Sequence, residues 1–427
     1  MRRRTIASST PGPERALTGF ASVLRVREFR WLWLANLQSI VGDQLTRVAL
    51  SILVFERTGS AWWTAATYAL LYLPSLLGGL LLGGLADRFP RRAVMVSCDV
   101  ARAGLVGCMA VPGVPLGVLA GLLTIAVLIG SIFGSAEPAL VADIFTGPRY
   151  TTALGLRAAS DQAAQLVGFA VGGLAVAAVG PRPALAVDAV TFAASALLLR
   201  VGLRSRPAVA AESTEGTTAG GLLAGVRLVA GNPRLVMLLA FGGLTGLWIV
   251  AEGLAVPYAA ATGGGAVAAG VLLAANPAGN VVGVTLFARL PGPERQASLV
   301  GPLSVLCGLP LIVCATRPGL GLTIALWTLS GVCSAYLVQV TAEYVPALPA
   351  AQRGQGLGVL SAAFLVAQGL GVLAGGGLAR IMPAADAVAW AGGTGSALAV
   401  ALTLWRKRIE SASGSIASAV PEGATDS

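Results

Sequence analysis

The chain has 427 residues, of which 56% are hydrophobic and 11% are charged, and its formal net charge is +10. This composition is typical of a polytopic membrane protein and not of a soluble domain or a nucleic-acid-binding protein. The chain has no histidine and its only lysine is Lys407, which excludes histidine-based catalysis, histidine metal sites and a Gly-x4-Gly-Lys phosphate loop, so we expect no enzymatic activity, no metal and no cofactor.

Apolar runs long enough to span a membrane occur twelve times along the chain. Turn-forming links such as Pro112-Gly113-Val114-Pro115 separate several of these runs. They predict an all-α integral membrane fold of twelve transmembrane helices in two pseudo-symmetric six-helix bundles. The expected bounds are 31–54, 61–86, 93–112, 115–136, 157–179, 183–203, 234–256, 265–288, 297–316, 319–341, 355–379 and 385–405.

The two halves of the sequence resemble each other, as tandem six-helix bundles should. For example, Ala136-Glu137-Pro138 recurs as Ala342-Glu343-Tyr344. The polar stretch between the halves favours a flexible linker, and the Ser/Ala/Gly-rich end favours disorder. The expected organisation is a cytoplasmic tail (1–30), a first bundle (31–203), a cytoplasmic linker (204–233), a second bundle (234–405) and a disordered cytoplasmic tail (406–427).

The basic residues predict the orientation of the chain. With both termini in the cytoplasm, nearly every arginine outside the spans lies on the inner side, as the positive-inside rule requires. The exceptions on the outer side are Arg57, Arg182, Arg317 and Arg380.

A basic turn follows the second apolar run and has the sequence Gly83-Gly84-Leu85-Ala86-Asp87-Arg88-Phe89-Pro90-Arg91-Arg92. Its spacing resembles the signature loop between helices 2 and 3 of the major facilitator superfamily, with Pro90 in the place of a glycine. The resemblance implies a gating motif made of Gly83, Asp87, Arg88, Arg91 and Arg92. In it the Asp87 carboxylate would pair with a basic residue or cap a facing helix N-terminus.

Further motifs extend the resemblance over nearly the whole chain. They are Gly42-Asp43, Thr58-Gly59-Ser60, Asp99-x-x-Arg102 and Asp188-Ala189-x-Thr191-Phe192. Together they resemble the bacterial efflux branch of the superfamily, which includes macrolide exporters and enterobactin-type siderophore exporters.

That resemblance implies a proton-driven antiporter that exports a small organic molecule by alternating access. It would work as a multi-pass monomer in the bacterial inner membrane. Its partners would be the substrate, protons and the lipid bilayer, and not nucleic acid. An importer, a lysophospholipid flippase and a non-transporting receptor of the same fold remain alternatives.

The glycine-rich motif of helix 5 is present as Gly168-Phe169-Ala170-Val171-Gly172-Gly173, with Phe169 where antiporters of the superfamily carry proline. Gly168, Gly172 and Gly173 still allow close contact between helices, but the proline kink is missing.

Ionisable residues inside the spans are costly in lipid and therefore point to function. Asp43 lies about 18 Å into the first span, and Arg47, four residues later, lies on the same helix face. The two residues would form either a static ion pair or a switch in which a proton replaces Arg47. Glu252, in the seventh span, is a second candidate for proton coupling or substrate binding.

Other charged residues predict structural roles. Asp99 and Arg102 lie one turn apart in the third span, which predicts a structural ion pair. Glu137, Asp161, Asp188 and Glu343 lie near predicted helix ends, where capping or gating is the expected role.

Overall fold

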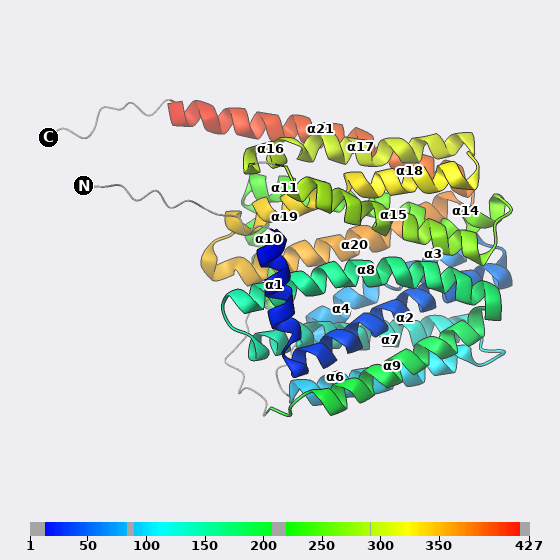
Figure 1. The fold of residues 1–427 in the computed structure, drawn as a ribbon. Coiled ribbons are helices and arrows are strands. Elements are labelled where there is room, and N and C mark those ends of the chain that lie inside the picture. Colours follow the sequence, from blue (N-terminus) through cyan, green and yellow to red (C-terminus); the bar gives the residue numbers. More distant parts are fainter. Residues whose placement is uncertain (1–12, 83–88, 207–218, 291, 419–427) are drawn as a thin grey trace.

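The computed structural model describes residues 13–82, 89–206, 219–290 and 292–418. These residues contain helices and turns but no strand. The end of the molecule where α1 and α10 lie is called the α10 end. The opposite end, where α3 and α14 lie, is called the α14 end (Figure 1).

The first half contains α1 (Pro13–Leu24), α2 (Arg27–Thr58), α3 (Ala61–Ala69), α4 (Leu73–Leu82), α6 (Arg91–Ala110), α7 (Leu116–Ile144), α8 (Pro148–Val179) and α9 (Pro181–Gly202). The second half contains α10 (Ala219–Ala230), α11 (Pro233–Gly243), α12 (Thr245–Trp248), α13 (Val250–Gly253), α14 (Ala255–Ala261), α15 (Ala266–Ala288), α16 (Pro293–Ser298), α17 (Val300–Ile312), η1 (Val313–Thr316), α18 (Leu320–Cys333), α19 (Tyr336–Ala347), η2 (Ala350–Gln352), α20 (Arg353–Leu378) and α21 (Ala384–Ser418).

Nine helical stretches in the described ranges are long and apolar enough to cross a membrane. The predicted runs 31–54 and 297–316, and the described part of the run 61–86, are largely helical but are not among these nine. The run 61–86 is divided into α3 and α4 by a turn, and the run 297–316 is divided between α17 and η1.

Three helices lie wholly or partly in the expected tails and linker. Helix α1 occupies part of the expected N-terminal tail, and α10 occupies the part of the expected flexible linker that the structure describes. Helix α21 continues to Ser418, well into the expected disordered tail. In α10 the cause is packing: Val229 is buried, and Gly225 lies against the backbone of Gln355 in α20. Burial of apolar surface therefore stabilises a helix that the polar residues before it did not suggest.

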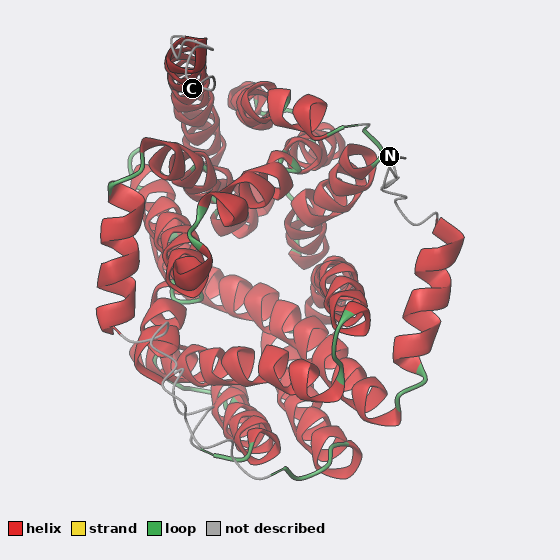
Figure 2. Ribbon diagram, turned by 90° about the vertical axis from the view of Figure 1, so that its left-hand side faces the viewer, coloured by secondary structure: helices red, strands yellow, loops and turns green. Residues whose placement is uncertain are grey.

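Helices of the first half pack mainly on one another, with α2 against α8 and α9, and α6 against α7 and α9. In the second half α15 packs on α18, and α17 packs on α18 and α21. The main contacts between the halves are those of α8 with α15 and of α3 with α20. Figure 2 shows many of the helices nearly end-on, as a bundle.

The contact between α8 and α15 depends on two glycines. A Cβ atom placed on Gly173 would lie 2.9 Å from the Gly270 Cα and 2.9 Å from the Ala266 carbonyl oxygen. These distances are too short for any side chain, so glycine is what allows the two backbones to touch.

Candidate functional site

A cavity of about 710 Å³ lies between the halves. It extends from Arg47, in the middle of α2, to Leu222 of α10. Its ionisable lining side chains all belong to the first half: Asp43, Arg47, Arg102, Glu137, Arg157, Asp161 and Asp188. The second half lines it with Leu222, Gly358, Ser361, Ala362 and Leu365.

Contacts between the halves close the molecule beyond the cavity, toward the α14 end. The Tyr68 hydroxyl of α3 donates a hydrogen bond to Glu252 Oε2 of α13 at 3.2 Å. Gly376 of α20 packs closely against Ala65 and Trp62 of α3. The cavity therefore lies between the middle of the molecule and the α10 end.

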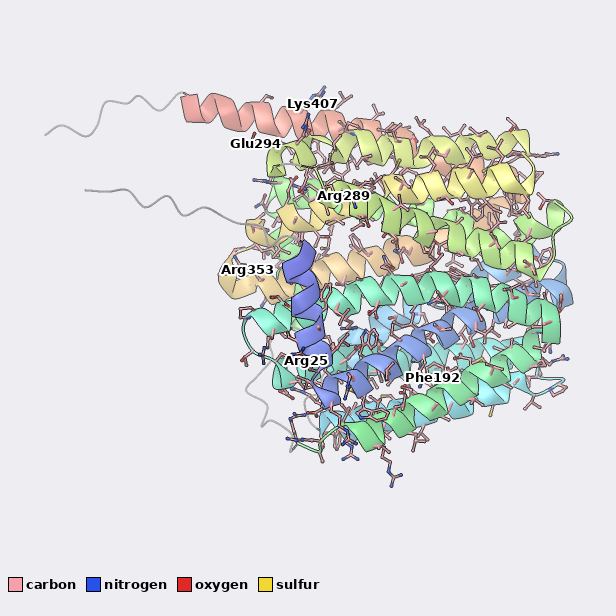
Figure 3. The ribbon with its side chains drawn as sticks, in the orientation of Figure 1. Arg25, Phe192, Arg289, Glu294, Arg353 and Lys407 are labelled. Carbon is pink, nitrogen blue, oxygen red and sulfur yellow. The ribbon has the colours of Figure 1, made fainter. Side chains whose placement is uncertain are left out.

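Asp43 of α2 forms an ion pair with Arg102 of α6 and not with Arg47, its neighbour on α2. Its Oδ1 lies 2.5 Å from an Arg102 guanidinium nitrogen, and that guanidinium lies 3.9 Å from the centre of the Phe192 ring. Figure 3 shows Phe192 on α9. In the described residues no hydrogen bond or ion pair joins Asp43 to Arg47, so the static ion pair is not found in this conformation and the proton switch stays a prediction.

The predicted ion pair between Asp99 and Arg102 is also absent from the described part of the chain. Asp99 is fully buried and accepts a hydrogen bond of 2.5 Å from the Ser195 hydroxyl of α9. Spacing along one helix placed Asp99 and Arg102 on neighbouring positions of α6, but Arg102 pairs with Asp43 across the bundle.

Asp188 is a third carboxylate next to this ion pair, and it is completely buried. The Thr46 hydroxyl donates to its Oδ2 at 2.5 Å, and the Thr191 hydroxyl donates to its Oδ1 at 2.9 Å. A Cβ atom on Gly42 would collide with Asp188 and Thr191. Glycine before Asp43 therefore makes room for the buried carboxylate, and hydroxyl donors satisfy it in place of an arginine.

A second charged group lies nearer the α10 end and was not predicted as a site. Arg157 Nε lies 2.8 Å from Glu137 Oε1 and 3.5 Å from Asp161 Oδ2. The Asn36 amide donates to Asp161 Oδ1 at 2.8 Å. Glu137 is only 3% exposed, which is unusual for a capping residue. The recurrence of Glu137 as Glu343 in the second half of the sequence could have indicated this site. Glu343 is likewise paired, with Arg406 at 3.1 Å.

Arg47 lies at the deep end of the cavity, and Glu252 of the other half lies beyond it, near enough to act on Arg47 electrostatically. Arg47 has Tyr68, Tyr72, Asp43 and Glu252 as electrostatic neighbours, and its side chain lines the cavity. It makes no hydrogen bond or ion pair with any residue that the structure describes.

Part of the basic signature turn is described. Gly83, Asp87 and Arg88 lie outside the described residues. Arg91 donates to Asp143 Oδ2 at 2.5 Å and to the Ala139 carbonyl at 3.0 Å, both in α7.

The next arginine, Arg92, donates to the Arg200 carbonyl at the end of α9. Just beyond α9, Arg206 makes two hydrogen bonds to Glu28, of 2.6 and 2.8 Å, and the first of them raises the pKa of Arg206. These arginines join helix ends at the α10 end of the first half.

The helix 5 glycines lie in helix contacts. A Cβ atom on Gly168 would lie 2.8 Å from the Gln44 side chain, and one on Gly172 would lie 3.3 Å from the Leu45 Cα, both in α2. Gly173 faces α15 instead, as described above. The motif thus lets α8 lie close to a helix of each half.

Comparison with known proteins identifies the family. The sequence profile described as "Major Facilitator Superfamily" matches residues 32–323. The multidrug efflux pump Tap of Mycobacterium tuberculosis (strain ATCC 25618 / H37Rv) is 29% identical over 375 residues, covering 81% of this chain and 85% of Tap. The uncharacterized MFS-type transporter YkuC of Bacillus subtilis (strain 168) is also 29% identical, over 183 residues and 42% of each protein.

Solved structures show the same fold at low sequence identity. The crystal structure of the nucleoside transporter NupG has a TM-score of 0.71 and 14% identity, covering 88% of this chain and 98% of NupG. A POT family transporter in complex with 5-aminolevulinic acid has a TM-score of 0.70 and 11% identity, covering 90% of this chain and 97% of that one. Because the profile covers well over half of the sequence, the chain belongs to the Major Facilitator Superfamily and is a membrane transporter, not an enzyme.

Proposed function

We propose that the transporter has twelve spans in two six-helix bundles, formed by residues 31–203 and 234–405. The nine apolar stretches supply most of these spans, and α2, α3 with α4, and α17 with η1 supply the other three. Arg47 and other polar residues lower the hydropathy of α2, while turns interrupt the other two runs.

The α10 end is proposed to face the cytoplasm of the bacterium, at its inner membrane. Arg25, Arg289, Arg353 and Lys407 lie toward this end (Figure 3). Basic residues remain on the cytoplasmic side of membrane proteins, so both termini and the linker would lie there.

The function that we propose is proton-coupled export of a small organic molecule by alternating access. The observation that carries the proposal is the cavity: it lies toward the α10 end, is lined by charged groups of the long apolar helices, and is closed toward the α14 end by Tyr68 and Glu252. The sequence similarity to Tap supports export of a drug-like molecule as the direction and cargo.

Proton coupling is assigned to Asp43, now with Arg102 as its partner. A proton on Asp43 would release the Arg102 guanidinium, and loss of the proton would restore the ion pair, which is a two-state switch at the cavity wall. Glu252, whose partner Tyr68 belongs to the other half, is the second candidate.

The signature turn is proposed to hold the conformation that is closed at the cytoplasmic side. Gly83, Asp87, Arg88, Arg91 and Arg92 would act there as one gating motif. The contacts of Arg91 and Arg92 with α7 and α9 support this role, because they fix the start of α6, directly after the turn, to the first half.

Inverted membrane vesicles test the direction and the coupling. Vesicles containing the transporter and acidified inside should accumulate ethidium or radiolabelled erythromycin, and a protonophore should abolish the accumulation. The matched control is vesicles from cells carrying the empty vector. Accumulation only in right-side-out vesicles would show an importer and overturn the proposal.

A further inference from the structure

The three arginines that line the cavity differ in their partners. Arg102 pairs with Asp43 and Arg157 pairs with Glu137, so each guanidinium is compensated by a carboxylate of the cavity wall. Arg47 lines the same cavity without a hydrogen bond or ion pair in the described part of the chain. A guanidinium near the middle of the membrane is costly unless an anionic group compensates it.

The Asp43 carboxylate, one turn from Arg47, is the most accessible member of the deep ion pair. Its side chain is 34% exposed, against 12% for Arg102. Only the Arg102 hydrogen bond to it is found among the described residues, while a carboxylate can accept several. Asp43 therefore presents a free acceptor toward the cavity, and the Cβ atoms of residues four apart on a helix lie about 5–6 Å from each other.

The opposite wall of the cavity is neutral. α20 contributes Gly358, Ser361, Ala362 and Leu365, and α10 contributes Leu222. A molecule held by the charges of α2 would thus lie with its other side against small and apolar side chains.

These charges discriminate between classes of molecule. A simple anion would pair with Arg47 but would meet the Asp43 carboxylate one turn away. A simple cation would pair with Asp43 but would lie beside two guanidinium groups, those of Arg47 and Arg102. A neutral molecule without a strong acceptor would leave the Arg47 guanidinium unbonded, since Asp43 and Glu252 act on it electrostatically without a hydrogen bond among the described residues.

We propose that the cavity binds amphoteric organic molecules, with the acidic group of the substrate on Arg47, its amine on Asp43 and its apolar body against α20. This assignment rests on the proposed transport function and names its substrate class. It also agrees with proton exchange, because the amine of the substrate and a proton compete for the same carboxylate of Asp43.

Matched probes test the assignment by binding to the purified, full-length protein in nanodiscs at fixed pH. One series is norfloxacin, its ethyl ester, which keeps only the amine, and its N-acetyl derivative, which keeps only the acid. The second series is the dipeptide Trp-Phe, its ethyl ester and its N-acetyl derivative. The amphoteric member of a series should bind at least about fivefold more tightly than either singly charged member, within the usual range of coupling between two sites.

Variants assign each charge to its residue. Arg47→Gln should remove the preference for the amphoteric probe over the ester, and Asp43→Asn should remove its preference over the N-acetyl derivative. Arg47→Lys keeps the charge and should retain part of the preference, which separates recognition from a general packing defect. A control, Arg317→Gln, changes an exposed arginine outside the cavity and should leave the ranking of the three probes unchanged.

Two outcomes would overturn the assignment: the ester binds as tightly as the amphoteric probe in the wild-type protein, or neither amphoteric probe binds. The proposed export function is measured separately, with ethidium and erythromycin in inverted vesicles. Proton-driven export of ethidium without binding of the amphoteric probes would refute the substrate class and leave the export function standing.

Discussion

The hydrogen bond from Tyr68 to Glu252 should set the balance between the two conformations of the transporter. It joins α3 of the first half to α13 of the second, at the side of the cavity that is closed. When the halves separate at the α14 end, this bond must break. Tyr68→Phe removes the donor and keeps the ring, so it should destabilise the conformation described here relative to the opposite one.

The geometry indicates how large the effect should be. A hydrogen bond to a charged group contributes about 1.5–3 kcal/mol. The O–O distance of 3.2 Å is longer than the usual range for hydroxyl donors, so the lower end of that range applies. A loss of about 1.5 kcal/mol changes the ratio of the two conformations about tenfold.

Spin labels can measure that ratio. Cysteines introduced at Glu56, near the end of α2, and at Thr262, just after α14, would report the distance between the halves at the α14 end. Of the native cysteines only Cys108 is exposed, and it would first be replaced by serine. Double electron–electron resonance should show the long-distance population rising about tenfold relative to the short-distance one.

Two further variants make the test specific. Tyr72→Phe is the matched control, since it removes a neighbouring tyrosine hydroxyl and should leave the distance distribution unchanged. In a Glu252→Gln background, Tyr68→Phe should have a much smaller effect, because the charged acceptor is already gone. An unchanged distribution in Tyr68→Phe, or an equal effect of both tyrosine variants, would refute the reasoning.

Four other changes have expected outcomes. Asp43→Asn should reduce pH-gradient-driven efflux from proteoliposomes to background but preserve counterflow, because it mimics the protonated carboxylate permanently. Asp87→Asn should lower the rate of transport while membrane insertion and substrate binding persist, as measured by expression level and equilibrium binding. Gly173→Ala should destabilise the protein by about 1–3 kcal/mol, measured as a lower Tm, since its Cβ would meet the backbone of α15 at 2.9 Å. Cysteines introduced at Thr214 and Val420 should not react with an impermeant maleimide added to intact cells.

Controls and contrary results follow from the same contacts. Gly134→Ala places its Cβ in open space and should leave the Tm unchanged or raise it. Glu252→Gln should reduce efflux less than Asp43→Asn, and the reverse order would move the coupling site to α13. Wild-type transport by Asp87→Asn would contradict the gating role, and external labelling at either cysteine would contradict the topology.

The sequence predicted the positions of the helices better than it predicted which side chains meet between them. Long apolar runs separated by Pro and Gly indicate membrane helices because length and hydropathy are local properties of the chain. Helices α7, α8 and α9 correspond to predicted spans, with ends that extend beyond the apolar runs. The signature turn and the Gly42-Asp43 pair led to the family that the profile comparison then showed.

Side-chain partners across helices were not readable in the same way. Spacing along α2 suggested Arg47 for Asp43, but the bundle brings Arg102 of α6 closer. Spacing along α6 suggested Arg102 for Asp99, but Ser195 of α9 donates to it. Both errors have one cause, since helix periodicity gives the face on which a residue lies and not the residue that meets it there.

The unequal division of charge between the cavity walls has a consequence for how this transporter can change over generations. The residues assigned to proton exchange lie on helices of the first half, whereas the α20 wall carries only small or aliphatic side chains at the cavity surface. Substitutions at Ser361 or Ala362 can therefore reshape the space offered to a cargo without touching an ion pair. Under the proposed export function, a bacterial population exposed to a new toxic compound would gain tolerance most easily through such single replacements on α20, because they leave the proposed proton-exchange residues intact.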